Sequence, residues 1–103
     1  MKFEDLENAV IDWADDRGIY KHSSAQAQLL KAVSEMGELA DAVIKKDYAA
    51  TEDAIGDVLV CLINFCAFYD ISPTYCLRLA WNQIKDRKGH MIIGGAFVKE
   101  ETK

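Results

Sequence analysis

The sequence predicts an all-α protein, a four-helix bundle followed by a short C-terminal hairpin or extended tail. Three observations support this fold class. The 103 residues include one proline and six glycines, so residues that break helices are scarce. Apolar residues recur at spacings of three and four, which is typical of amphipathic helices. Half of the residues are hydrophobic, and a chain of this length builds one core, so we expect a single domain over residues 1–103.

The first two predicted helices are amphipathic. The first covers residues 3–16 and stops near Gly18, which suits the C′ position of a helix. The second begins at a cap from Ser23 or Ser24 and reaches about residue 46. The apolar stripe of this second helix consists of Leu29, Val33, Met36, Ala40, Val43 and Ile44. We expect this stripe to face the core.

The third predicted helix is the most apolar. Thr51 supplies its cap, and it continues through Ile71. After Asp57 the helix is apolar on every side, which is typical of a helix buried all round.

The last segments are a fourth helix and a tail. Ser72 and Pro73 end the third helix and start the fourth, because serine caps helices and proline suits the first helical position. This helix extends to about residue 88. Two β-prone runs around Gly94 and Gly95 then predict the hairpin or extended tail.

Charge and composition exclude several classes of partner. The net charge of −5 argues against binding to a nucleic-acid polymer, although an acidic protein can act on small phosphates through a divalent cation. The three cysteines form no CxxC pair, so we expect buried, reduced thiols. The N-terminus lacks the pattern of a signal peptide, and the longest apolar run, residues 58–69, is too short for a bilayer. We therefore expect a cytoplasmic protein without a membrane partner.

Four carboxylates form the candidate metal site, and one amide lies in line with two of them. Glu35 and Glu38 lie one turn apart on the second helix, and Asp53, Asp57 and Asn64 lie close to one line on the third. If these helices pack antiparallel, the acids face one another. Clustered carboxylates without histidine or thiolate suit Mg²⁺ or Mn²⁺ rather than zinc. Alternatively, the glutamates lie on a solvated face, and the aspartates are first-turn acids or pair with basic residues.

The basic and aromatic candidates for substrate binding also have two interpretations. The fourth helix carries Arg78, Asn82 and Lys85 on one stripe, with Arg87 just beyond, and cations of this kind can bind phosphate. The alternative is a solvated basic face that balances an acidic protein. Trp13 either packs in the core or stacks on a nucleobase.

Residues 34–39 (SEMGEL) and 53–59 (DAIGDVL) resemble segments of the MazG-like, all-α nucleoside triphosphate pyrophosphohydrolases. The resemblance extends over nearly the whole chain. It includes an opening helix with a tryptophan before Arg-Gly, and a downstream Lys-Asp-Arg. The closing RKG and GAFVK look like those of the small stand-alone members that phages often encode.

The family pattern is EExxE followed, after a spacer, by ExxD, and the resemblance implies that these carboxylates bind magnesium. Three positions match the pattern: Glu35, Glu38 and Asp57. Ser34 and Ala54 stand where the pattern has glutamate. Asp53, one turn before Asp57, is then a candidate for the replaced oxygen.

The resemblance implies Mg²⁺-dependent hydrolysis of a nucleoside triphosphate between its α and β phosphates. Glu35, Glu38 and Lys85 are the expected catalytic residues, with Glu35 taking a proton from water. The expected substrate-binding residues are Trp13, Asn64, Arg78, Asn82, Lys85 and Arg87. The family architecture implies a homodimer or homotetramer with sites near subunit contacts. The alternatives are a non-catalytic nucleotide-binding protein with a degenerate site and a plain helical oligomerisation protein.

Overall fold

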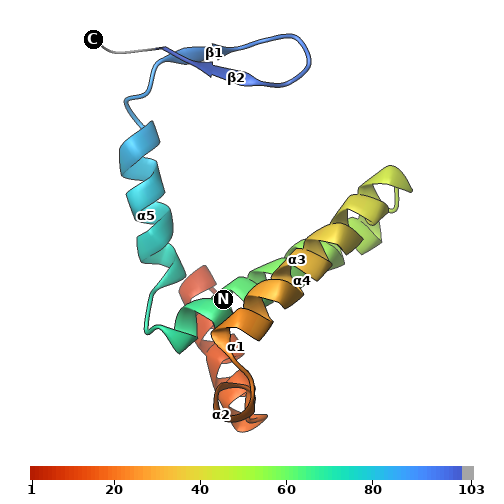
Figure 1. Ribbon diagram of the computed structural model, residues 1–103, viewed down its shortest axis with the longest axis vertical. Helices are drawn as coiled ribbons and strands as arrows, with labels where there is room; N and C mark the ends of the chain where they lie inside the picture. The colour runs from red at the N-terminus through yellow and green to blue at the C-terminus, as the bar shows by residue number, and fades with distance from the viewer. Residues whose placement is uncertain (101–103) are drawn as a thin grey trace. The chain divides into compact units, whose positions relative to one another are not determined.

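The computed structural model describes residues 1–100, which form five helices and a two-stranded hairpin (Figure 1). In chain order the elements are α1 (Phe3–Asp16), α2 (Ile19–His22), α3 (Ala25–Ile44), α4 (Tyr48–Phe68), α5 (Pro73–Ile84), β1 (Gly89–Met91) and β2 (Phe97–Lys99). The all-α prediction is confirmed. The chain divides into two compact units, Met1–Pro73 and the residues from Thr74 onward.

The start of the first unit follows the sequence closely. Helix α1 has the predicted bounds, and Gly18 adopts the left-handed conformation, with φ of 77°, that the C′ position favours. Helix α2, a single turn that begins directly after Gly18, was not predicted from the sequence. The backbone N–H of Ser23 donates to the carbonyl of Ile19 and closes this turn.

Helix α3 is capped as predicted but turns a different face to its neighbour. The Ser24 hydroxyl accepts a hydrogen bond from the backbone N–H of Ala27, at 3.0 Å. The buried side chains of α3 are Gln28, Ala32 and Ala42, whereas Val33 of the predicted core stripe is 63% exposed. The small side chains allow α3 and α4 to approach closely, because interaxial distance depends on the residues at the contact. The expectation that the more apolar stripe faces the core of this chain was wrong.

Helix α4 begins four residues before its predicted start and ends three residues before its predicted end. Its cap is Asp47, which accepts from the backbone N–H of Ala50 at 3.0 Å, so the prediction of Thr51 as the cap was wrong. At the other end Asp70 has a φ of 55°, and the backbone N–H of Ile71 donates to the carbonyl of Cys66, which terminates the helix.

The apolar surface of α4 is covered on part of its circumference. Helices α3 and α4 lie side by side (Figure 1), and α1 also contacts α4. The side chains of Ile55, Leu59 and Leu62, which share one stripe, stay exposed. The expectation that this helix is buried on every side was therefore wrong for the single chain.

The best-buried polar group of the first unit joins α2 to α4. The Tyr20 hydroxyl donates to Asn64 Oδ1 at 2.8 Å, and Asn64 is 2% exposed. The ring of Tyr20 meets Phe68 edge to face, with 5.3 Å between centroids. Burial, and then the negative charge of Asp15, raise the pKa of Tyr20. This contact fixes the short helix against α4.

Tyr20→Phe is expected to lower the free energy of unfolding by about 1–2 kcal/mol, because it leaves a buried acceptor on Asn64 without its donor. Urea unfolding measures the change. Tyr48→Phe is the matched control, since Tyr48 is exposed. Equal unfolding midpoints for the two variants would contradict the assigned hydrogen bond.

The second unit contains α5 and the predicted hairpin. Helix α5 ends at Ile84, about four residues before the predicted end. Strands β1 and β2 pair antiparallel, with His90 opposite Val98. Gly94 and Gly95 have φ values of 106° and 101°, which the turn between the strands requires and glycine adopts readily. Within residues 1–100 no single helix has the length and apolar composition of a membrane span, and α4 and α5 meet these criteria only as a broken pair.

Candidate functional site

Glu35 is the centre of the candidate site. Its Oε2 atom is buried and accepts no hydrogen bond from any residue in 1–100. Burial raises the pKa of Glu35, and its hydrogen bond with Glu38 and the negative charges of Glu38 and Asp57 raise that pKa further, while Lys31 opposes the shift. Three of the four predicted acids therefore act on one another.

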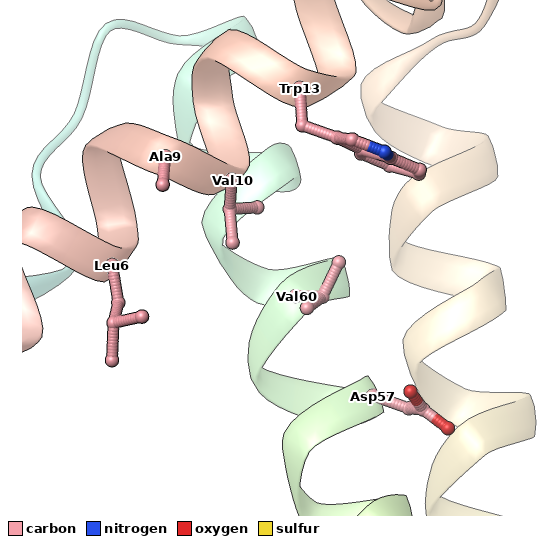
Figure 2. A pocket seen from close by; sticks show the side chains of 6 residues that line it. All are labelled: Leu6, Ala9, Val10, Trp13, Asp57 and Val60. Carbon is pink, nitrogen blue, oxygen red and sulfur yellow. The ribbon is translucent and has the colours of Figure 1, made fainter.

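Helix geometry explains this grouping. Glu35 and Glu38 are three residues apart on α3, so they share a face. Figure 2 shows the Asp57 carboxylate directed from α4 toward α3. The predicted juxtaposition of the glutamate pair with Asp57 is thus present, and it follows from the close packing of α3 on α4.

Asp53 differs from the other three acids. It is exposed, and its charge is not among those that shift the pKa of Glu35. Ala54 takes the buried position instead, with 5% of its surface exposed. The methyl group of Ala54 therefore lies where the family pattern has a glutamate side chain. Metal binding by Asp53 stays a prediction.

The orphaned oxygen of Glu35 provides a test of whether a cation fits here. A buried carboxylate oxygen without a donor is costly, and a divalent cation offsets that cost. The donor set, three carboxylates, suits a hard ion such as Mg²⁺ or Mn²⁺. No three Asp, Glu, His or Cys side chains in the described part of the chain converge closely enough to hold an ion as they stand. The residues fit a cation in chemistry, and their side chains must rotate to enclose it.

An apolar pocket of about 400 Å³ adjoins the carboxylates. Its lining residues are Leu6, Ala9, Val10, Trp13, Asp57 and Val60 (Figure 2). Trp13 reaches from α1 toward α3 and is 44% exposed. This exposure favours stacking on a nucleobase over packing in the core. The Arg17 guanidinium lies 4.8 Å from the centroid of the Trp13 ring. Asp57 belongs to both the pocket and the carboxylate group.

Two residues near the acids were not candidates from the sequence. Lys31 lies one turn before Glu35 on α3, and its positive charge acts on both Glu35 and Cys61. Burial raises the pKa of the Cys61 thiol; Lys31 lowers it, and Glu35 and Asp57 raise it further. The spacing of four residues between Lys31 and Glu35 is the sequence feature that could have identified Lys31. The same spacing of opposite charges is equally common on solvated helix faces.

The remaining predicted site residues are Asn64 on α4 and four residues of the second unit. Asn64 was expected to bind a sugar hydroxyl or a metal-bound water, but it is buried and its carbonyl oxygen accepts from Tyr20. Packing of α2 on α4 explains its polarity instead. The predicted phosphate-binding residues all belong to the second unit and are exposed: Arg78, Asn82, Lys85 and Arg87. Cys76, expected to be buried, is also exposed there.

Glu35→Gln is expected to raise the melting temperature of the metal-free protein by a few degrees at neutral pH and to remove most of the stabilisation by Mn²⁺. The raised pKa means that Glu35 contributes full stability below its unfolded pKa, and loses it as pH rises through the folded pKa. The deficit of the wild type relative to the variant should therefore grow as pH rises above about 4.5.

Differential scanning fluorimetry from pH 4 to pH 8, with and without Mn²⁺, measures both effects. Cation binding favours the ionised carboxylate, so stabilisation by Mn²⁺ should increase over the same pH range. Glu52→Gln is the control, because Glu52 is exposed on α4. An equal pH response of both variants would contradict the special environment of Glu35.

Comparisons with known proteins show similarity in sequence to a phage protein and in structure to a solved phage enzyme. No family model matches the chain. An uncharacterised 18.2 kDa protein of Haemophilus phage HP1 is 33% identical over 60 residues, which are 58% of this chain and 37% of that protein. The chain thus matches little more than a third of the relative's length.

The structural neighbour is a MazG-like pyrophosphohydrolase of cyanophage S-2L, solved with dGDP and three catalytic Mn²⁺ ions per active site. The TM-score is 0.71, and the match covers 100% of this chain and 97% of the neighbour, at 16% sequence identity. At that identity the likeness establishes the architecture. The chain therefore has the all-α fold of a MazG-like pyrophosphohydrolase.

Proposed function

We propose that the protein hydrolyses a nucleoside triphosphate between the α and β phosphates, in a reaction that depends on Mg²⁺ or Mn²⁺ and yields a nucleoside monophosphate and pyrophosphate. The observation that carries the proposal is the double position of Asp57, which lies in the carboxylate group and also lines the pocket with Trp13. A nucleoside in the pocket would then have its phosphates beside the acids. The fold likeness to an enzyme solved with dGDP and Mn²⁺ supports the same chemistry.

The cation would be held by three carboxylates, those of Glu35, Glu38 and Asp57. When bound, such an ion neutralises phosphate oxygens and makes water a stronger nucleophile at neutral pH. The exposed Asp53 could join these ligands only by reorienting its side chain, so it remains the least supported member of the predicted set.

Glu35 has the environment of a general base. Its carboxylate lies in the group of acids that would hold the cation, so a proton acceptor would stand beside the water that the cation activates. In the proposed step, water attacks phosphorus at the α–β bridge and its proton passes to Glu35. The phosphorus–bridge-oxygen bond breaks, and that electron pair leaves with pyrophosphate or with the monophosphate, according to which phosphorus is attacked.

Cations of the chain would stabilise the charge that develops on the phosphates. Lys31 already lies in the electrostatic surroundings of the acids. Lys85 is the proposed catalytic cation of the second unit, and Arg78, Asn82 and Arg87 are proposed to contact the substrate. We propose that the enzyme works in the cytoplasm as a homodimer or homotetramer.

A non-catalytic nucleotide-binding protein is the second candidate function. The observation in its favour is the replacement of two pattern glutamates by Ser34 and Ala54, since Ala54 occupies a buried place beside Asp57 without offering an oxygen. Such a protein would bind nucleotide and metal without turnover.

A panel of canonical and modified nucleoside triphosphates, each with Mg²⁺, Mn²⁺ or EDTA, tests the proposal. We expect metal-dependent release of pyrophosphate, and no orthophosphate, from at least one nucleotide. Calorimetric binding of nucleotide and metal without either product would establish the second candidate. A protein that shows neither nucleotide binding nor turnover would exclude both candidate functions.

A further inference from the structure

The antiparallel packing of α3 on α4 places residues of the two helices at matching levels. The helices lie side by side and are joined by a short link with Lys46 at its middle, so residues equally far from Lys46 lie level with each other (Figure 1). Glu35 and Asp57 are each 11 residues from Lys46. Lys31 and Cys61 are each 15 residues from it. Lys31 therefore lies one helical turn from the acids, level with Cys61.

The charges around Cys61 and Glu35 agree with this placement of Lys31. Burial raises the pKa of the Cys61 thiol, and Lys31 is the positive charge that lowers it. Lys31 also lowers the pKa of Glu35. Its ammonium does not pair with the buried Oε2 atom of Glu35, which accepts no hydrogen bond from any residue in 1–100. The side chain of Lys31 is exposed and flexible, so it can turn toward an anion.

The level of Lys31 is also that of the apolar pocket. Asp57 and Val60 both line the pocket, and Cys61 directly follows Val60 on α4. Trp13, another lining residue, is directed from α1 toward α3 (Figure 2). Phosphates that extend from a nucleoside in this pocket to the acids would therefore pass the turn of α3 that carries Lys31.

A metal ion and Lys31 compete for the same carboxylates. In the metal-free protein, the ammonium of Lys31 balances part of the negative charge of Glu35, Glu38 and Asp57. A divalent cation bound to these acids repels an ammonium one turn away, because the two charges have the same sign. A phosphate that binds to the cation brings negative charge back to this place, and the ammonium can then contact it.

We propose that Lys31 is a phosphate-binding residue of this site and that it exchanges partners: it balances the carboxylates in the metal-free protein and contacts a phosphate group once the cation is bound. The identity of that phosphate as part of a nucleotide substrate rests on the proposed function. Because Lys31 is on the same helix as Glu35 and Glu38, the contact is made within one chain and is additional to any contact made by Lys85.

Lys31→Met removes the charge and keeps an unbranched side chain. In calorimetric titrations at low salt, we expect this variant to bind Mn²⁺ about three- to tenfold more tightly than the wild type, because a like charge is gone. In saturating Mn²⁺ it should bind inorganic tripolyphosphate about tenfold more weakly or worse, because a charge-assisted contact is lost. Lys31→Arg keeps the charge, so both affinities should stay within about threefold of the wild type.

Lys21→Met is the matched control, because it makes the same change of net charge at an exposed residue of α2. Opposite shifts of the two affinities in Lys31→Met, absent from Lys21→Met, are the expected result. Equal shifts in both variants would reflect net charge alone and would overturn the proposal. It would also be overturned by weaker Mn²⁺ binding or unchanged tripolyphosphate binding in Lys31→Met, or by a wild type that does not bind tripolyphosphate.

These titrations need no turnover, so they separate this inference from the proposed function. If the wild type hydrolyses no nucleotide but the opposite shifts appear, the proposed function fails and phosphate binding by Lys31 stands. If the wild type releases pyrophosphate from a nucleotide and Lys31→Met binds Mn²⁺ and tripolyphosphate as the wild type does, the function stands and the role of Lys31 fails.

Discussion

Asp57→Asn is expected to lower kcat/KM for pyrophosphate release by about 10³-fold and to weaken Mn²⁺ binding, while the helical circular dichroism stays unchanged. Asparagine keeps the shape of the side chain but removes the negative charge that a cation needs. The effect should be large because the carboxylate of Asp57 lies at the junction of the acids and the apolar pocket. Coupled pyrophosphate assays and calorimetric Mn²⁺ titration measure the two losses.

Asp53→Asn is the matched control on the same helix. Asp53 is exposed, and its charge is not among those that shift the pKa of Glu35, so activity should stay within about tenfold of the wild type. Unchanged Mn²⁺ affinity in this variant would remove Asp53 from the ligand set predicted from the sequence. Equal losses in both variants would show instead that Asp53 reorients to bind the ion, whereas full activity of Asp57→Asn would contradict the proposed site.

The acids could be found from sequence because their grouping depends on local rules. Glu35 and Glu38 share a face by helical spacing alone, and the short connection between α3 and α4 brings Asp57 opposite them. Helix ends were less certain because neighbouring residues compete for one cap. Asp47 and Thr51 both suit an N-cap, and in the structure Asp47 is the cap. The Thr51 hydroxyl instead donates a hydrogen bond to the Asp47 carbonyl, at 2.8 Å.

The packing face of α3 could not be predicted from periodicity. Hydrophobic spacing marks the stripe of Leu29, Val33 and Met36 as a contact surface, but it does not say which surface meets it. Within one copy, α3 instead turns Ala32 and Glu35 toward α4, because small side chains permit the closer approach. Asn64 shows the same limitation. Its polar side chain on an apolar helix suggested a role in substrate or metal binding. In the structure it accepts a hydrogen bond from Tyr20, which lies on α2, a helix that the sequence analysis did not predict.

Trp13→Ala is expected to raise KM at least tenfold with little change in kcat. Stacking of a base on an aromatic side chain contributes about 1–3 kcal/mol, and loss of an interaction made equally in the ground and transition states changes KM alone. The ring is half exposed over an apolar pocket and lies against the Arg17 guanidinium, so one face is already held by the protein. Trp13→Phe should keep most of the affinity, because phenylalanine retains an aromatic face.

The fluorescence of Trp13 itself tests its contact with the nucleotide without any turnover. The chain has two tryptophans, so a Trp81→Phe background leaves Trp13 as the single indole reporter. Nucleotide binding in the presence of Mn²⁺ should quench its fluorescence in proportion to occupancy. If Trp13 were a core residue instead, Trp13→Ala would lower the unfolding free energy by about 3–5 kcal/mol and leave KM unchanged. The exposure of the ring, together with its place in the pocket that Asp57 also lines, is the reason to expect the loss in binding rather than in stability.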